Sequence, residues 1–223
     1  MVEFVLFMLF SILETCALLF LAFKTFKIDI FPIEMVFASI VSGFFSYVLR
    51  HEYGLIDLDV LIQFVLMFCF IWLLFRIHIF YAVIMTSMAY QAYLLIQTFY
   101  YLFFEQFNLL VHLPEFSSNV TAYTLQTLSA FTGFFLGILI GRSRKGFDFI
   151  PDKPTGRITV QFREKILFAL SIPSILIILC TMQLTAQLSH YYFVLPAVYA
   201  IILYTYLYLS YKKDRNGYEH NGS

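Results

Sequence analysis

Apolar residues dominate this chain in long runs, which are separated by short stretches where charged residues, glycine and proline gather. Runs of about 20 apolar residues match the length that a helix needs to cross the hydrocarbon core of a bilayer. The pattern predicts seven membrane-spanning helices, at residues 3–23, 31–49, 59–75, 79–104, 120–141, 166–186 and 190–211. The predicted fold class is therefore all-α, a polytopic bundle of about seven transmembrane helices.

Composition favours lipid as the solvent for most of the surface. Hydrophobic residues make up 61% of the 223 residues and charged residues 13%. Soluble domains carry about 25% charged residues. The formal net charge is zero, so overall charge points neither to a nucleic-acid partner nor to an acidic substrate. The N-terminal "MVEFVLFMLF" lacks the basic region of a cleavable signal peptide, so the first run is expected to remain as a helix.

The basic residues predict the orientation. With the N-terminus outside, thirteen of the fourteen lysines and arginines fall on the cytoplasmic side, and Arg50 alone lies outside. This predicts a transmembrane domain over residues 1–211, with a basic cytoplasmic loop at 142–165, and a short cytoplasmic tail at 212–223. The loop is expected mainly to fix the topology and touch anionic lipid, or else to dock a cytoplasmic partner. The predicted location is the cell membrane, of the bacterial cytoplasmic type.

Few ionisable residues lie inside the predicted spans, where such groups are costly and are often functional. Glu14 is the one near the middle of a span, and it is interpreted either as a ligand contact or as a hydrogen-bonded link between helices. Glu34, Asp57 and Asp59 lie near span ends, where they are expected to anchor the helices at the membrane interface.

The fourth span carries the clearest polar pattern. Thr86, Tyr90, Tyr93 and Gln97 recur at spacings that keep them on one helical face, and Ser87 and Gln91 broaden it. Such a face should look into the bundle, because lipid offers amides no hydrogen-bond partner. It could line a ligand pocket or form a network between helices. The candidate ligand-binding residues are Glu14, Thr86, Tyr90, Gln91, Tyr93 and Gln97.

Glycines in the fifth span predict close helix packing. Gly133, Gly137 and Gly141 repeat every four residues, a spacing that makes a groove for another helix, within the chain or between subunits of a homodimer. Pro173 and Pro196 lie inside the sixth and seventh predicted spans and predict kinks there.

No enzyme motif is present in the sequence. It contains no HExxH, GxSxG or GxxxxGK[ST] motif, and it predicts no metal site and no cofactor. Cys16, Cys69 and Cys180 lack metal-ligand spacing and are expected to be buried thiols. A Cys69/His78 peptidase pairing is conceivable, but no residue is evident to orient it.

Three segments carry a family resemblance: "FKIDIF" after the first span, "FRIHIFYAVIMTSMAYQAYLLIQTFYYLF" across the third and fourth, and "LSYKKDR" near the end. With the seven spans and small outer loops, they resemble the membrane sensor portion of accessory-gene-regulator-type histidine kinases, which sense quorum-signalling peptides in Gram-positive bacteria. In that family the last helix continues into a phosphoacceptor helix and an ATP-binding domain. No kinase domain follows "LSYKKDR" here, so the chain by itself is not expected to be a kinase.

Two functions follow as hypotheses. The first is a membrane sensor or receptor that binds a hydrophobic peptide or lipid-like signal within the bundle and relays it to a cytoplasmic partner. The alternative is a small membrane subunit of a transporter or assembly complex, which would bind a substrate within the bundle or hold partners through the glycine face.

Overall fold

The computed structural model describes residues 2–107, 120–150, 162–187 and 194–221. Within these ranges the chain forms helices and no strand, which confirms the predicted all-α class. The elements are α1 (Val2–Thr25), α2 (Pro32–Tyr47), the π-helical η1 (Val48–Glu52), α3 (Ile56–Cys69), the π-helical η2 (Phe70–Leu74), α4 (Ile79–Gln106), α5 (Val120–Ser143), α6 (Phe162–Gln187) and α7 (Val194–Asn221).

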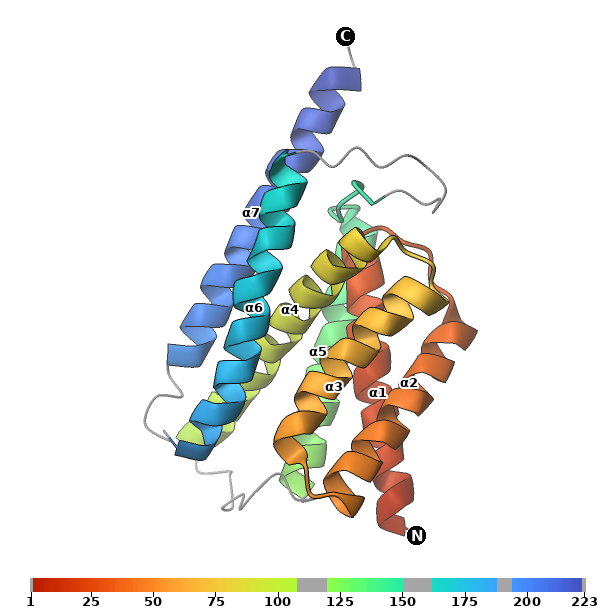
Figure 1. The fold of residues 1–223 in the computed structure, drawn as a ribbon, viewed down its shortest axis with the longest axis vertical. Helices are drawn as coiled ribbons and strands as arrows, with labels where there is room; N and C mark the ends of the chain where they lie inside the picture. The colour runs from red at the N-terminus through yellow and green to blue at the C-terminus, as the bar shows by residue number, and fades with distance from the viewer. Residues whose placement is uncertain (1, 108–119, 151–161, 188–193, 222–223) are drawn as a thin grey trace.

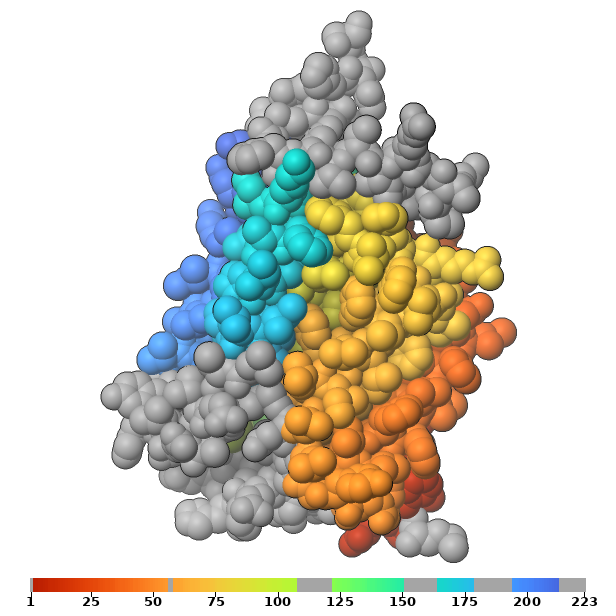
Figure 2. All heavy atoms as spheres, viewed as in Figure 1, coloured from red at the N-terminus to blue at the C-terminus, as the bar shows by residue number. Residues whose placement is uncertain are grey.

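Several helices have the length and surface of membrane spans. Over the described residues, five are long and apolar enough to cross a bilayer: Val2–Thr25, Pro32–Glu52, Ile79–Gln106, Ala122–Ser143 and Val194–Lys212. A shorter apolar helix covers Leu58–Leu74. Large apolar side chains such as Ile33, Phe131 and Ile201 are exposed on the outside of the bundle. Figure 2 shows one such face, which α2, α3, α6 and α7 cover with their side chains. Apolar surface on this scale indicates a protein embedded in a membrane.

α4 is the central helix of the bundle (Figure 1). It contacts α1, α3 and α5 on one side and α6 and α7 on the other. Apart from α4, α1 packs against α2 and α5, and α6 packs against α7 and α3. Because α4 is covered on more than one side, polar residues on different faces of this helix all come to lie inside the protein.

Three helical segments end in the same way at one end of the bundle. α1, η2 and α5 all finish at the top of Figure 1, the end where the chain also terminates. Each is followed by a basic residue with left-handed backbone: Lys27 (φ 52°), Arg76 (φ 55°) and Arg144 (φ 52°). Glycine is usual at such positions, since it has no Cβ to strain. A cation there lies near the carbonyl oxygens that give a helix C-terminus its partial negative charge.

The first part of the basic loop packs against the C-terminal end of α1. The backbone N–H of Phe147 donates to the carbonyl oxygen of Thr25 at 2.7 Å, and both Phe147 and Ile150 are buried. The expected roles of this loop, fixing the topology and touching anionic lipid or docking a partner, stay predictions. Its aromatic residues also pack it against the bundle, since the ring centroids of Phe149 and Phe26 lie 5.7 Å apart. Residues 151–161, which include most of "RITVQF", lie outside the described residues.

Replacing Gly146 with alanine is expected to lower the free energy of unfolding by about 1–3 kcal/mol, because overpacking has a cost of this size. A Cβ atom at this position would lie 2.8 Å from the carbonyl oxygen of Lys24 and 2.9 Å from that of Thr25. Thermal unfolding in mild detergent measures the effect. Gly141→Ala is the matched control, since its Cβ would meet only the flexible Lys24 side chain at 3.3 Å. Equal midpoints for the two variants would contradict the docking of this loop.

The two prolines differ in their placement. Pro173 lies inside α6, as predicted. Pro196 is the third residue of α7, in its first turn, where a missing N–H leaves no helical hydrogen bond unmade. The kink predicted at Pro196 is therefore not required. α7 itself continues past Lys212, where the tail was expected to begin, to Asn221.

Candidate functional site

A carboxyl group in the middle of α1 joins three helices. The amide nitrogen of Gln97 on α4 donates to Oε1 of Glu14 at 2.5 Å, and Gln126 on α5 also hydrogen-bonds this carboxyl. Hydrogen bonds to a carboxylate are shorter and stronger than those between neutral groups. The Glu14 carboxyl thus links the helices that surround it, which is one of the two interpretations of this residue. Gln126 was not among the candidate site residues, although the sequence places it two helical turns before Gly133 on α5.

Two tyrosines of α4 lie close enough to Glu14 to experience its charge: Tyr90 and Tyr93. The ring of Tyr93 is buried, and it lies 3.6 Å from where a Cβ at Gly133 would stand. Tyr90 meets the edge of Phe64 on α3, with ring centroids 5.2 Å apart. The structure therefore brings Glu14, Tyr90, Tyr93 and Gln97 into one cluster between α1, α3, α4 and α5.

A second polar network lies near the opposite end of the bundle from the basic helix ends. Asp59 on α3 is fully buried and forms an ion pair with Arg50 of η1, with Nε and Oδ2 2.5 Å apart. Ser46 donates to the same oxygen at 2.8 Å. Gln63 donates to Asp59 Oδ1 at 3.3 Å and to the carbonyl of Ser42 at 2.9 Å. Every oxygen of this buried carboxylate thus has a donor, as a buried charge requires.

Asp59 was expected to anchor a helix end at the membrane interface, and the structure shows its carboxylate buried within the protein. The π-helical turn η1 places Arg50 beside this inward-facing carboxylate. Such turns often occur at functional sites. The opposite charges of Arg50 and Asp59, on either side of a predicted turn, were the sequence signal for this pair. Glu34 is partly buried, and the side chain of Asp57 is outside the described residues.

The polar residues of α4 occupy two faces of the helix instead of one. At about 100° per residue, Ser87 and Gln91 lie well round the helix from the face that holds Tyr93 and Gln97. Ser87 lies beside the hydroxyl of Tyr206 on α7. Gln91 is one helical turn further along the same face, so this second face points toward the α6–α7 pair.

Some buried polar groups of the bundle have no hydrogen-bond partner. Gln91 has no exposed surface, and neither its amide oxygen nor its amide nitrogen is bonded. The same holds for the hydroxyl groups of Thr86, Tyr93 and Ser129. A buried unpaired polar group costs about 1–3 kcal/mol, so each such group needs an explanation. A bound molecule with polar groups of its own would supply the missing partners.

The α6–α7 pair has its own small network. The Tyr206 hydroxyl donates to Ser171 Oγ at 3.2 Å and accepts from Ser174 Oγ at 3.3 Å. Tyr206 is fully buried. These bonds tie the part of α7 beside α4 to α6, so a shift of α4 against Tyr206 would move both helices together.

The glycine groove of α5 is filled by α1 of the same chain. A Cβ at Gly133 would lie 3.5 Å from Ala17, one at Gly137 would lie 2.7 Å from the Phe20 ring, and one at Gly141 would lie 3.3 Å from Lys24. The groove therefore serves packing within the chain.

Cys16 and His78 make local contacts. Cys16 Sγ lies 3.1 Å from Ser39 Oγ, and His78 Nδ1 accepts from the backbone N–H of Phe80 at the start of α4. Among the described residues, no group of three or more His, Cys, Asp or Glu side chains is arranged to hold a metal. The side chain of Cys180 lies outside those residues.

Comparison of the chain with protein-family models, with curated proteins and with solved structures found no match.

Proposed function

We propose that this chain is a seven-span membrane receptor, with its N-terminus outside and its C-terminus in the cytoplasm. Five helices qualify as spans by length and composition, and α6, with 26 residues, is long enough to be another. The orientation is supported by the basic residues Lys27, Arg76 and Arg144, which close helices at the same end of the bundle. Arg50, at the other end, is neutralised by Asp59.

The observation that carries the receptor function is the unpaired amide of Gln91. A fully buried glutamine with both amide atoms unbonded is unfavourable unless a ligand or a buried water completes it. The side-chain amide of glutamine has N–H donors and a carbonyl acceptor, which can pair with the C=O and the N–H of a peptide group. A hydrophobic peptide or a lipid-like molecule with an amide would offer such a group while the rest of the molecule contacts the apolar bundle. This chemistry agrees with the peptide-sensing family that the sequence resembles.

α4 would transmit binding to the cytoplasmic side. One face of α4 is tied to α1 and α5 through Glu14 and Gln97, and the other contacts α7 near Tyr206. A ligand bound at Gln91 would favour one position of α4 relative to α7, because it binds the two arrangements unequally. The C-terminal part of α7 would present this change to a cytoplasmic signalling partner.

The alternative, a transporter or assembly subunit, remains a prediction. Its expected partner surface was the glycine groove of α5, and that groove packs against α1 in this chain.

Replacing Gln91 with leucine tests the receptor function. Removing an orphaned amide at nearly constant volume is expected to raise the thermal unfolding midpoint by about 2–4 °C. The same change is expected to reduce the amount of small molecule that co-purifies with the protein by at least about tenfold, because the ligand loses both hydrogen bonds. Differential scanning fluorimetry and mass spectrometry of molecules released from the purified protein measure the two effects.

Gln63→Leu is the matched control, because Gln63 donates to Ser42 and Asp59 and its loss should lower the midpoint. A lower midpoint for Gln91→Leu would show that this amide has a partner within the protein. An unchanged set of released molecules would count equally against the receptor function.

A further inference from the structure

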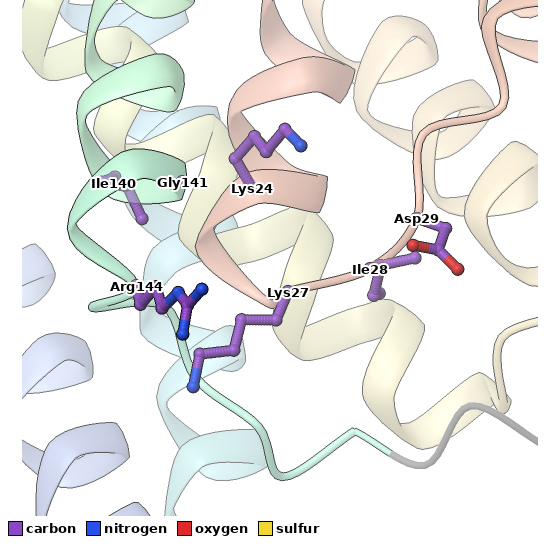
Figure 3. Close-up of a pocket in the computed structure, with 7 residues that line it drawn as sticks. All are labelled: Lys24, Lys27, Ile28, Asp29, Ile140, Gly141 and Arg144. Atoms are coloured by element: carbon purple, nitrogen blue, oxygen red, sulfur yellow. The ribbon is translucent and has the colours of Figure 1, made fainter.

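A basic pocket lies between the ends of α1 and α5 (Figure 3). Its volume is about 310 Å³, and it is lined by Lys24, Lys27, Ile28, Asp29, Ile140, Gly141 and Arg144. Three of these residues are cations, and they come from two helices that are far apart in the sequence. Figure 3 shows the Lys27 side chain extended across the end of α1 toward the guanidinium group of Arg144.

None of the three cations has a carboxylate partner within the part of the chain that the structure describes, where Arg50 and Asp59 form the ion pair. Lys24 has its ammonium 5.8 Å from the centre of the Phe20 ring. Asp29 lines the other side of the pocket, and Figure 3 shows it on the opposite side of the view from Arg144. The lining therefore carries an excess of positive charge. Like charges that converge in this way repel one another unless an anion lies between them.

The backbone adds a second observation. Lys27 and Arg144, the two cations that approach each other, both have left-handed backbone at positions where glycine would fit without strain. A strained residue that persists at a site is a reason to look for a function of its side chain. Arg76 has the same backbone conformation outside the pocket, so what sets Lys27 and Arg144 apart is that they also share a cavity.

The pocket also has an apolar wall. Ile28 and Ile140 line it beside the cations. The pocket lies where two candidate membrane spans end, after Thr25 and Ser143, which is the level expected for lipid headgroups. A ligand with a phosphate and an adjoining apolar part would complement both kinds of wall.

We propose that this pocket binds the phosphate group of an anionic ligand, with Lys27 and Arg144 as the direct contacts and Lys24 at its inner side. The phosphate can belong to an anionic phospholipid of the surrounding leaflet or to a soluble molecule. The site is separate from Gln91 and does not depend on the receptor function.

The test uses the full chain, purified in an uncharged detergent, with the thermal unfolding midpoint followed as ligand is added. The probes are phosphatidylglycerol, phosphatidylcholine and inorganic phosphate. Wild-type protein is expected to bind phosphatidylglycerol at least about tenfold more tightly than phosphatidylcholine, because hydrogen bonds to charged groups contribute strongly. The variant Lys27→Gln/Arg144→Gln is expected to lose this preference.

Arg142→Gln/Lys145→Gln is the matched control. It removes the same charge from the same end of α5 but alters no residue of the pocket, so binding should change less than about twofold. Lys27→Gly is a second variant, in which misfolding is not expected to cause a loss of binding. Glycine relieves the strain of the left-handed backbone at this position while the substitution removes the cation. It is expected to keep or raise the unfolding midpoint and still lose several-fold in affinity.

Competition by inorganic phosphate at millimolar concentration would identify a site that accepts soluble phosphates, whereas binding of phosphatidylglycerol alone would identify a lipid site. Both results support the proposal. Equal losses in the pocket and control variants, full affinity in Lys27→Gly, or equal binding of the two lipids would overturn it.

Discussion

Replacing Asp59 with leucine is expected to lower the free energy of unfolding by about 3–5 kcal/mol, the usual cost of breaking a buried ion pair from one side. The substitution leaves Arg50 without its carboxylate, and it removes the acceptor of Ser46 and one acceptor of Gln63. The sequence contains one tryptophan, Trp72, so its fluorescence during titration with dodecyl sulfate follows unfolding directly.

A double substitution separates the ion pair from simple packing. Arg50→Met with Asp59→Leu replaces both charges by apolar groups, and such replacements are often nearly neutral. The double variant is therefore expected to be more stable than Asp59→Leu alone. If the two single effects simply add, or if Asp59→Leu costs less than about 1 kcal/mol, the carboxylate is not buried against Arg50 as described.

Replacing Gly137 with leucine is expected to destabilise the bundle by about 3 kcal/mol, at the upper end of the usual cost of overpacking. A single Cβ at this position would already lie 2.7 Å from two atoms of the Phe20 ring and 3.6 Å from Cα of Leu21. The remaining atoms of leucine would force α1 away from α5 and strain the contact of Glu14 with Gln126. The unfolding midpoint and the yield of monodisperse protein measure the effect.

Ala200→Leu provides the comparison, because Ala200 is exposed on α7 and its enlargement displaces no neighbouring helix. We expect its midpoint to stay near that of the wild type. A tolerated leucine at Gly137 would show that the groove does not hold α1, and it would restore the possibility that the groove contacts a partner.

The helices could be predicted from the sequence because each one depends on the residues of its own segment. A run such as residues 79–104 is apolar and uninterrupted, and the structure has α4 there, from Ile79 to Gln106. The limits of most other helices differ by a few residues, whereas α7 continues from the predicted end at residue 211 to Asn221. The number of spans is supported for five helices, and the orientation remains a proposal.

The site could be predicted less well, because it depends on how the helices pack against one another. Glu14 and Gln97 could each be selected from their own helix, but their hydrogen bond requires the packing of α1 beside α4. Asp59 lies at a helix end, where exposure is the usual outcome, and only the π-helical turn of η1 brings Arg50 to it. The docking of Gly146 and Phe147 against Thr25 likewise depends on a contact between segments distant in the sequence.

The placement of Glu14 has a consequence for how the protein is made. Glu14 leaves the ribosome before both of its amide partners, because Gln97 follows it 83 residues later and Gln126 later still. If the helices enter the membrane in the order of synthesis, the carboxyl of Glu14 is in the membrane before the side-chain amides of Gln97 and Gln126 can hydrogen-bond to it. The apolar length of α1 has to offset that carboxyl alone, since an acidic group at a helix centre opposes insertion by about 2.5–3.5 kcal/mol. Substitutions that make α1 less apolar would then act on biogenesis, before the finished bundle exists to be destabilised.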